Sequence, residues 1–132
     1  MSAERPVIVN QAEVDWESWD DPDVAARSPV RWKLLIAGER GPSRGLVQGV
    51  LEVPPGASLL LHHHEPEETY YVLSGRGRMR IDGSESALGP GSAVFIPSNA
   101  RHAVRCTGRE PLVIVFVFAR DRFDQVVYRF DA

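Results

Sequence analysis

The side chains of this chain that are best suited to chemistry lie in residues 56–75. This stretch holds three of the four histidines and a cluster of three glutamates. The remaining histidine, His102, lies in a second stretch, residues 91–106. Neutral imidazole is the general protein ligand for first-row divalent metals, and a carboxylate adds negative charge. We therefore expect one transition-metal site to which both stretches contribute.

Strand periodicity separates the three adjacent histidines. Alternate side chains of a β-strand lie on the same face. In a strand over residues 58–64, His62 and His64 therefore share a face with Leu60, and His63 points to the other side. Bringing His102 from the second stretch to this face places three imidazoles around one point.

The choice of carboxylate is not decided by periodicity. The sequence Glu65-Pro66-Glu67 interrupts the first strand and resets its register. If Glu68 faces inward, then Tyr70 and Val72 face inward with it. Four protein ligands leave two positions of an octahedral ion open for water, substrate or dioxygen, as catalytic metals require. The absence of thiolates from the first stretch argues against a closed structural zinc site.

The elements that must hold these residues are short strands. Strands are expected over residues 30–37, 45–53, 58–64, 69–73, 77–81, 93–96, 103–107 and 112–119. Glycine and proline turns separate them, and Asp82-Gly83 is a hairpin signal. The last of these strands is apolar on both faces, so we expect both faces to be buried. Many short strands with regular turns are typical of an all-β sandwich or barrel, here over residues 30–132.

The ends of the chain differ from this pattern. We interpret residues 1–29 as an N-terminal arm with a short strand at Val7–Val9. Its Trp16 and Trp19 are expected to pack on the barrel or on a partner subunit, and the alternative is a tryptophan lid over the pocket. Near the other end, residues 126–128 are consistent with a last strand or with a short helix.

Composition excludes several classes of function. With 132 residues and a net charge of −3, the chain has no basic field for nucleic acid or an anionic membrane. The apolar run at residues 112–119 is too short to span a bilayer as a helix, and the N-terminus lacks a secretory signal. The single cysteine, Cys106, excludes an intramolecular disulfide and is expected to be a small buried hydrophobe. We therefore expect a cytoplasmic protein.

The two stretches resemble the two motifs of the cupin superfamily. The first motif is matched in full: Gly56, five residues, His62, one residue, His64, three residues, Glu68, six residues and Gly75. The second is matched in part: Gly91, five residues, Pro97 and then His102, with Asn99 where glycine is usual and Cys106 where asparagine is usual. Asparagine tolerates left-handed backbone nearly as glycine does, so the first departure is mild.

The resemblance implies a fold, a cofactor and an assembly. The fold would be a single-domain cupin, which is an antiparallel jelly-roll β-barrel. The resemblance selects Glu68 among the glutamates, so that His62, His64, Glu68 and His102 would bind one divalent transition metal. Fe, Mn, Ni, Zn, Co and Cu all accept such a set. Single-domain cupins are usually homodimers, often with a shared N-terminal strand, so a homodimer is expected.

For function, we expect a metal-dependent enzyme whose partner is a small organic substrate held in a mostly apolar pocket. The candidate apolar residues of this pocket are Leu60, Val72, Met79, Ile81, Val94 or Phe95, Val104, and Phe116 or Val117. Glu68 or Tyr70 would handle the proton while the metal stabilises an enolate. Dioxygenase chemistry is our first expectation, and lyase, isomerase or cyclase chemistry is the alternative. Tyr70 resembles the catalytic base of the cupin lyases that cleave dimethylsulfoniopropionate, although barrel packing is its other interpretation. A non-catalytic binding or sensing protein is the second class of function.

Overall fold

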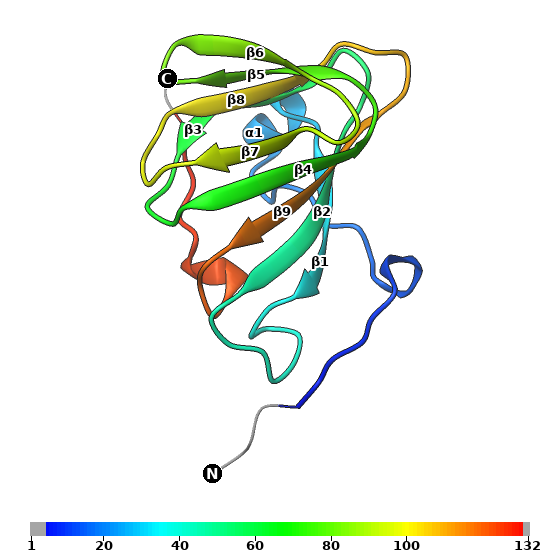
Figure 1. Cartoon of the computed structure of the whole chain (residues 1–132), viewed down its shortest axis with the longest axis vertical. Coiled ribbons are helices and arrows are strands. Elements are labelled where there is room, and N and C mark those ends of the chain that lie inside the picture. The colour runs from blue at the N-terminus through cyan, green and yellow to red at the C-terminus, as the bar shows by residue number, and fades with distance from the viewer. Residues whose placement is uncertain (1–4, 131–132) are drawn as a thin grey trace.

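The computed structural model describes residues 5–130, which form two five-stranded antiparallel sheets that face each other as a jelly-roll barrel (Figure 1). The strand orders are β1-β2-β9-β4-β7 and β10-β3-β8-β5-β6. The strands are β1 (Arg31–Ile36), β2 (Val47–Val53), β3 (Ser58–His63), β4 (Glu68–Ser74), β5 (Gly77–Ile81), β6 (Ser84–Leu88), β7 (Ala93–Ile96), β8 (His102–Cys106), β9 (Leu112–Phe118) and β10 (Arg129–Phe130). The all-β prediction is confirmed.

Three short helices lie outside the sheets: η1 (Gln11–Glu13), α1 (Pro22–Arg27) and η2 (Phe123–Gln125). Proline is tolerated in a first helical turn, and α1 begins at Pro22 behind Asp21. The Asp21 side chain accepts hydrogen bonds from the backbone N–H groups of Asp23 and Val24, which caps the helix. Within residues 5–130, no helix is long and apolar enough to cross a membrane.

Eight of the ten strands correspond to predicted ones, and the two exceptions are β6 and β10. Residues 126–128, expected as a last strand or a short helix, have no regular secondary structure and lie between η2 and β10. The prediction missed β6, because its residues 84–87 are exposed and its sequence is largely polar. Strand β6 pairs with β5 across the predicted Asp82-Gly83 turn, where both residues have positive φ. The predicted strand at Val7–Val9 was wrong, since these residues have no regular secondary structure and Ile8 is 98% exposed.

Strand β9 is buried on one face only. Leu112, Ile114, Phe116 and Phe118 point into the core, whereas the valines between them are half-buried. The expectation of two buried faces is therefore met only in part. The other face belongs to the outer surface of the first sheet, where β9 lies between β2 and β4.

The N-terminal arm lies against β1. Backbone hydrogen bonds of 2.7 and 3.0 Å join Glu17 to Trp32 in both directions. The Trp19 ring packs against the Trp32 ring with a centroid distance of 4.8 Å. The Trp16 ring lies elsewhere, with the Arg31 guanidinium 3.9 Å from its centroid. The two tryptophans of the arm therefore have different surroundings.

Two glycines test how tightly the barrel turns are packed. Gly75 and Gly83 have nearly equal φ values of 85° and 87°. A Cβ at Gly75 would overlap the Pro111 carbonyl and lie 2.8 Å from the Leu112 Cα, whereas a Cβ at Gly83 would meet nothing within 4 Å. We expect Gly83→Ala to cost about 1–2 kcal/mol through backbone strain alone. We expect Gly75→Ala to cost about 2 kcal/mol more, because of the overlap. Urea denaturation measures both, and equal losses would contradict the prediction.

Candidate metal centre

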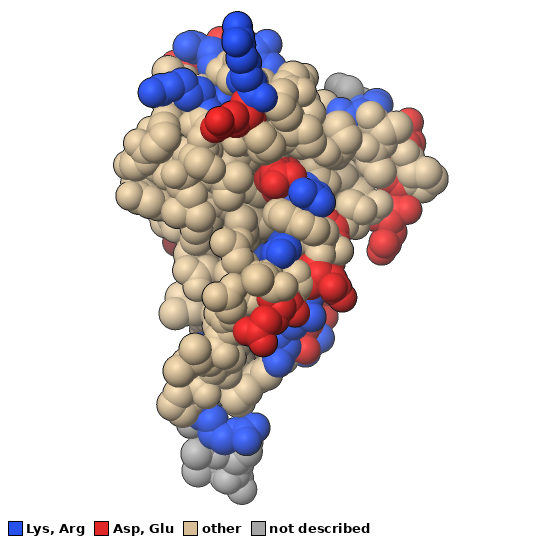
Figure 2. All heavy atoms as spheres, turned by 90° about the vertical axis from the view of Figure 1, so that its right-hand side faces the viewer, with Lys and Arg blue, Asp and Glu red and all other residues tan. Residues whose placement is uncertain are grey.

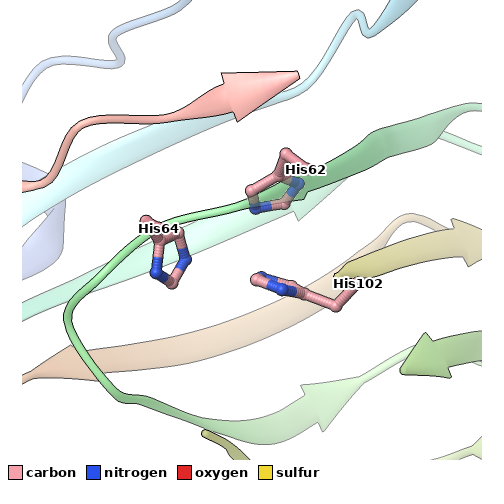
Figure 3. Close-up of side chains that lie close together, drawn as sticks. All are labelled: His62, His64 and His102. Atoms are coloured by element: carbon pink, nitrogen blue, oxygen red, sulfur yellow. The ribbon is translucent and has the colours of Figure 1, made fainter. Parts of the chain in front are cut away.

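Two strands of one sheet bring the three inward histidines together. His62 lies in β3 and pairs in register with His102, the first residue of β8. His64 follows just after the end of β3. All three side chains are buried, and their ligand atoms lie within 4.8 Å of one another. Figure 3 shows the three rings converging on one point.

A β-bulge in β3 sets this geometry. Leu59 pairs with Val104 and His62 pairs with His102, so three steps along β3 match two along β8. The extra residue reverses the alternation between Leu59 and His62, and both therefore face the interior. Our expectation that Leu60 shares the inner face with His62 was therefore wrong, because Leu59 packs in the core instead.

Each inward imidazole is fixed in one tautomer by a backbone carbonyl. The Nδ1 atoms of His62, His64 and His102 lie 2.7, 2.9 and 2.8 Å from carbonyl oxygens two residues away. A carbonyl can only accept a hydrogen bond, so each Nδ1 carries the proton and donates it. Each Nε2 therefore keeps a free lone pair. The Nε2 atoms of His62 and His102 are buried without a hydrogen-bond partner.

Glu68 is the glutamate that the fold brings to the imidazoles. Its Oε1 lies 3.2 Å from the Nε2 of His64 and 3.6 Å from the Nε2 of His102. The side chain is only 4% exposed, whereas Glu65 and Glu67 are exposed. A carboxylate oxygen and an unprotonated Nε2 are both acceptors, so their close approach is favourable only when a cation lies between them.

The fourth histidine faces away from this point, as periodicity predicted. The Nδ1 of His63 lies 3.3 Å from the Asn99 Oδ1. Asn99 has a φ of 60°, so asparagine serves in left-handed backbone where the cupin motif usually has glycine. Its backbone N–H donates to the His64 carbonyl over 2.8 Å and ties the loop before β8 to the end of β3. Asn99 therefore positions His64 from outside the site.

The residues present fit a divalent transition metal. Nitrogens bound to one ion at about 2.1 Å lie about 3.0 Å apart at right angles and about 4.2 Å apart when opposite. The ligand atoms of the three histidines all lie within 4.8 Å of one another, an upper limit about 0.6 Å above the longer of these distances. Three neutral imidazoles and one carboxylate are a usual donor set for such an ion, and the hydrogen bonds at Nδ1 are the support that ligating histidines need.

Burial shifts the acid–base behaviour of the side chains around the centre. Desolvation, and next the nearby His102, hold the pKa of His62 well below its usual value. Desolvation, with a smaller contribution from Glu68, raises the pKa values of Tyr70 and Tyr128 well above their usual value. Both phenols are therefore protonated at neutral pH in the metal-free protein.

A cavity of about 20 Å³ adjoins the centre at Glu68 and Tyr70. Sequence reasoning found Tyr70 and raised Phe116 as a candidate, but it missed Trp32, Phe123 and Tyr128 as cavity walls. No strand pattern marks these last three as neighbours, because they come from the edge strand β1 and from the tail after β9. Trp19 of the arm also lines the cavity.

Other expected pocket residues lie elsewhere. Met79, Ile81 and Val94 line a separate cleft of about 410 Å³ between β5, β6 and β7. Phe95, the alternative to Val94, is 58% exposed on the outer surface. Cys106 is buried, as expected, and its thiol lies 3.2 Å from the Glu110 carbonyl rather than among the groups assembled at the centre.

Comparison with known proteins places these observations in a family. Residues 49–118 match the Cupin domain family model. The dimethylsulfoniopropionate lyase DddW of Ruegeria pomeroyi is 39% identical over 103 residues, which are 78% of this chain and 67% of that protein. The quercetin 2,3-dioxygenase of Bacillus subtilis is 32% identical over 72 residues, which are 54% of this chain and 21% of that protein.

A solved structure adds a third chemistry. The structure of the polyketide cyclase RemF from Streptomyces resistomycificus matches this chain with a TM-score of 0.79 and 25% sequence identity. The match covers 97% of this chain and 87% of that one. The matched regions span 67%, 60% and 41% of the first three curated relatives. Similarity to these proteins therefore covers one common barrel and several reactions.

Removing one imidazole tests the metal site. We expect purified protein to bind about one divalent metal per chain, and His102→Ala to lower the metal affinity at least about 100-fold. Loss of a direct ligand should exceed the 10- to 100-fold effect of an outer partner. Elemental analysis and competition with a chelator measure both quantities. His63→Ala is the matched control, and an equal loss in both variants would contradict the assignment.

The metal-free protein should lose stability in mild acid. The unfolded chain takes up a proton at His62 near pH 6.5, but the folded chain does so only at lower pH. The free energy of unfolding therefore falls as the pH drops below 6.5, by up to about 1.4 kcal/mol per pH unit for this group. Urea denaturation with a chelator between pH 8 and pH 5 measures the fall. His62→Gln should reduce the slope, and an unchanged slope would contradict it.

Proposed function

The chain belongs to the cupin family, and we propose that it is a metal-dependent lyase that eliminates a leaving group from a small organic carboxylate. The similarity to the dimethylsulfoniopropionate lyase DddW supports this reaction class, because it extends over 78% of the chain. The quercetin dioxygenase similarity extends over 54%. We therefore rank elimination above the dioxygenase chemistry that the sequence alone favoured.

The observation that carries the proposal is the position of Tyr70. It lies two residues after Glu68 on the same inward face of β4 and is 1% exposed. Its ring centroid is 6.4 Å from that of His102, and it lines the cavity together with Glu68. A group that can transfer a proton thus lies near the three imidazoles and lines the adjoining cavity, as an elimination requires.

With dimethylsulfoniopropionate as the model substrate, the reaction is a β-elimination. A base removes a proton from the carbon next to the carboxylate, and that electron pair forms a carbon–carbon double bond. The carbon–sulfur bond breaks with its electrons on sulfur, which gives acrylate and neutral dimethyl sulfide. A bound divalent cation would act as a Lewis acid that stabilises the negative charge developing at the carboxylate.

We assign proton removal to Tyr70. Burial and Glu68 raise the pKa of its phenol, so the metal-free protein holds it protonated. A divalent cation held by the neighbouring imidazoles and Glu68 would favour the phenolate form of Tyr70, because an opposite charge within a few ångströms stabilises an ionised group. Glu68 then serves as a ligand and as the charge that keeps the phenol basic once it ionises.

A direct assay tests the lyase proposal. Protein reconstituted separately with Fe, Mn, Ni, Zn, Co or Cu should release dimethyl sulfide and acrylate in equal amounts from dimethylsulfoniopropionate. Tyr70→Phe should keep its metal and lose about 100-fold or more in kcat. Gas chromatography and metal analysis read these outcomes.

His102→Ala is the background for this assay. If no metal gives product above that background, the lyase proposal fails. Oxygen uptake with a flavonol would then favour a dioxygenase, and binding of small carboxylates without turnover would favour a non-catalytic binding protein.

We also propose that the protein is a homodimer joined through the outer face of the first sheet. Tyr71, Leu73 and Phe95 on β4 and β7 are 49%, 46% and 58% exposed. The half-buried valines of β9 lie next to them, since Tyr71 pairs with both Ala93 and Val115. Figure 2 shows charged side chains at the top, at the right and in a band down the middle of the molecule, beside a mostly uncharged surface along the left-hand side. The outward residues of β4, β7 and β9 carry no charge, so this part of the sheet can meet its own copy without burying charge.

The oligomeric state tests this interface. The native chain should elute with the mass of two chains in light scattering, and the variant Tyr71→Glu/Phe95→Glu should have the mass of one. Burying carboxylates between two apolar faces costs more than such a contact provides. Arg78→Glu, on the outer face of the second sheet, is the control. A native monomer, or a double variant that remains dimeric, would contradict the proposal.

A further inference from the structure

Four aromatic rings form a closed circuit around the cavity beside Glu68. They are Trp19, Trp32, Phe123 and Tyr128, and we call them the aromatic box. Successive ring centroids around the circuit are 4.8, 6.1, 6.2 and 5.2 Å apart. All four rings line the same cavity. The box therefore has an aromatic wall on each of its four sides.

The one charged residue that lines this cavity is acidic. Its remaining lining residues are Leu51, Leu59, Phe116, Tyr70 and Glu68. Among the lining residues there is no lysine, arginine or histidine, and Glu68 is the one acid. Aromatic faces carry a negative quadrupole, so the rings and the carboxylate both favour a cation. An anionic group would meet no positive side chain there.

The box adjoins the metal centre directly. The Tyr128 ring belongs to the box and also lies 5.2 Å from the His62 ring and 5.3 Å from the His64 ring. Glu68 lines the cavity and contacts the imidazoles. A ligand with its anionic end at the metal centre would therefore reach the box within a few bonds.

We propose that the aromatic box is the subsite for a methylated onium group, sulfonium or quaternary ammonium, of a short zwitterionic substrate. The proposal rests on the proposed function, because it places the substrate carboxylate at the metal centre. A methylated onium group is weakly hydrated, so the attraction of aromatic ring faces can compensate for the hydration that it loses on burial. Tryptophan provides the strongest such attraction. Trp19 and Trp32 are thus the residues that determine specificity for the leaving group.

The box must expand to hold this group. A cavity of about 20 Å³ has room for roughly one water molecule. Trp19 comes from the arm, and Phe123 and Tyr128 come from the tail, which runs up the left-hand end of the barrel in Figure 1. These three walls lie outside the ten strands and can separate without breaking a strand ladder.

Packing, rather than hydrogen bonding, holds the tryptophan walls together. The indole N–H groups of Trp19 and Trp32 are buried and have no hydrogen-bond partner among residues 5–130. Outside the box, the segment after β9 is held by the Glu39 carboxylate, which accepts from the backbone N–H groups of Phe123 and Asp124, and by the pairing of β10 with β3. An entering cation therefore exchanges ring–ring contacts for ring–cation contacts.

Two isosteric ligands separate charge recognition from apolar burial. One is 3-(trimethylammonio)propionate, and the other is 4,4-dimethylpentanoate, which has a neutral carbon in place of the nitrogen. Calorimetric titration of the metal-loaded native protein should show at least about tenfold tighter binding of the onium ligand. Equal or tighter binding of the neutral isostere would overturn the proposal.

Tryptophan variants assign that preference to the box. Trp19→Leu keeps an apolar side chain but removes the ring, and it should abolish the preference for the onium ligand. Trp19→Phe, which retains a weaker ring, should keep part of it. Trp16→Leu is the control, because that ring lies outside the cavity under Arg31. A preference that survives in Trp19→Leu would overturn the assignment, with circular dichroism confirming that each variant folds.

The outcomes distinguish this inference from the lyase proposal. Preference for the onium ligand without release of dimethyl sulfide would support the onium subsite and contradict the lyase proposal. Release of dimethyl sulfide by a protein that does not prefer the onium ligand would do the reverse. The calorimetric titration needs no turnover, so it measures ligand preference in the aromatic box independently of catalysis.

Discussion

Four atoms that accept hydrogen bonds converge at one end of the barrel with no proton shared among them. Backbone carbonyls occupy the donor side of His62, His64 and His102, which leaves three imidazole lone pairs and the Glu68 carboxylate facing one another. Such an arrangement is unfavourable in a buried site unless a cation completes it. The bulge in β3, the Asn99 loop and the inward face of β4 all serve to hold this unpaired set in place.

The sequence predicted the parts of this site that depend on local geometry. Alternation separated His63 from its neighbours, and the motif spacing selected Glu68. The prediction for Leu60 failed because a bulge inserts one residue, and periodicity cannot show where a partner strand shifts by one. His62 was placed correctly because the resulting error falls on the residues before it.

The walls of the cavity could not be predicted in the same way. Trp19, Phe123 and Tyr128 meet across more than 100 residues of sequence, and each comes from a segment without strand periodicity. Their contacts depend on how two ends of the chain pack against the barrel, which is a non-local property. The barrel therefore follows from its sequence pattern, whereas the identity of its pocket follows from the arm and the tail.

The pairing of β10 with β3 has a practical consequence for how the protein is handled. Phe130 lies opposite His62 in register, so the last described residue of the chain is a direct neighbour of one of the three converging imidazoles. A polyhistidine affinity tag at that end would bring competing imidazoles to the site at high effective concentration. Metal content is therefore best measured on protein whose tag is at the other end or has been removed.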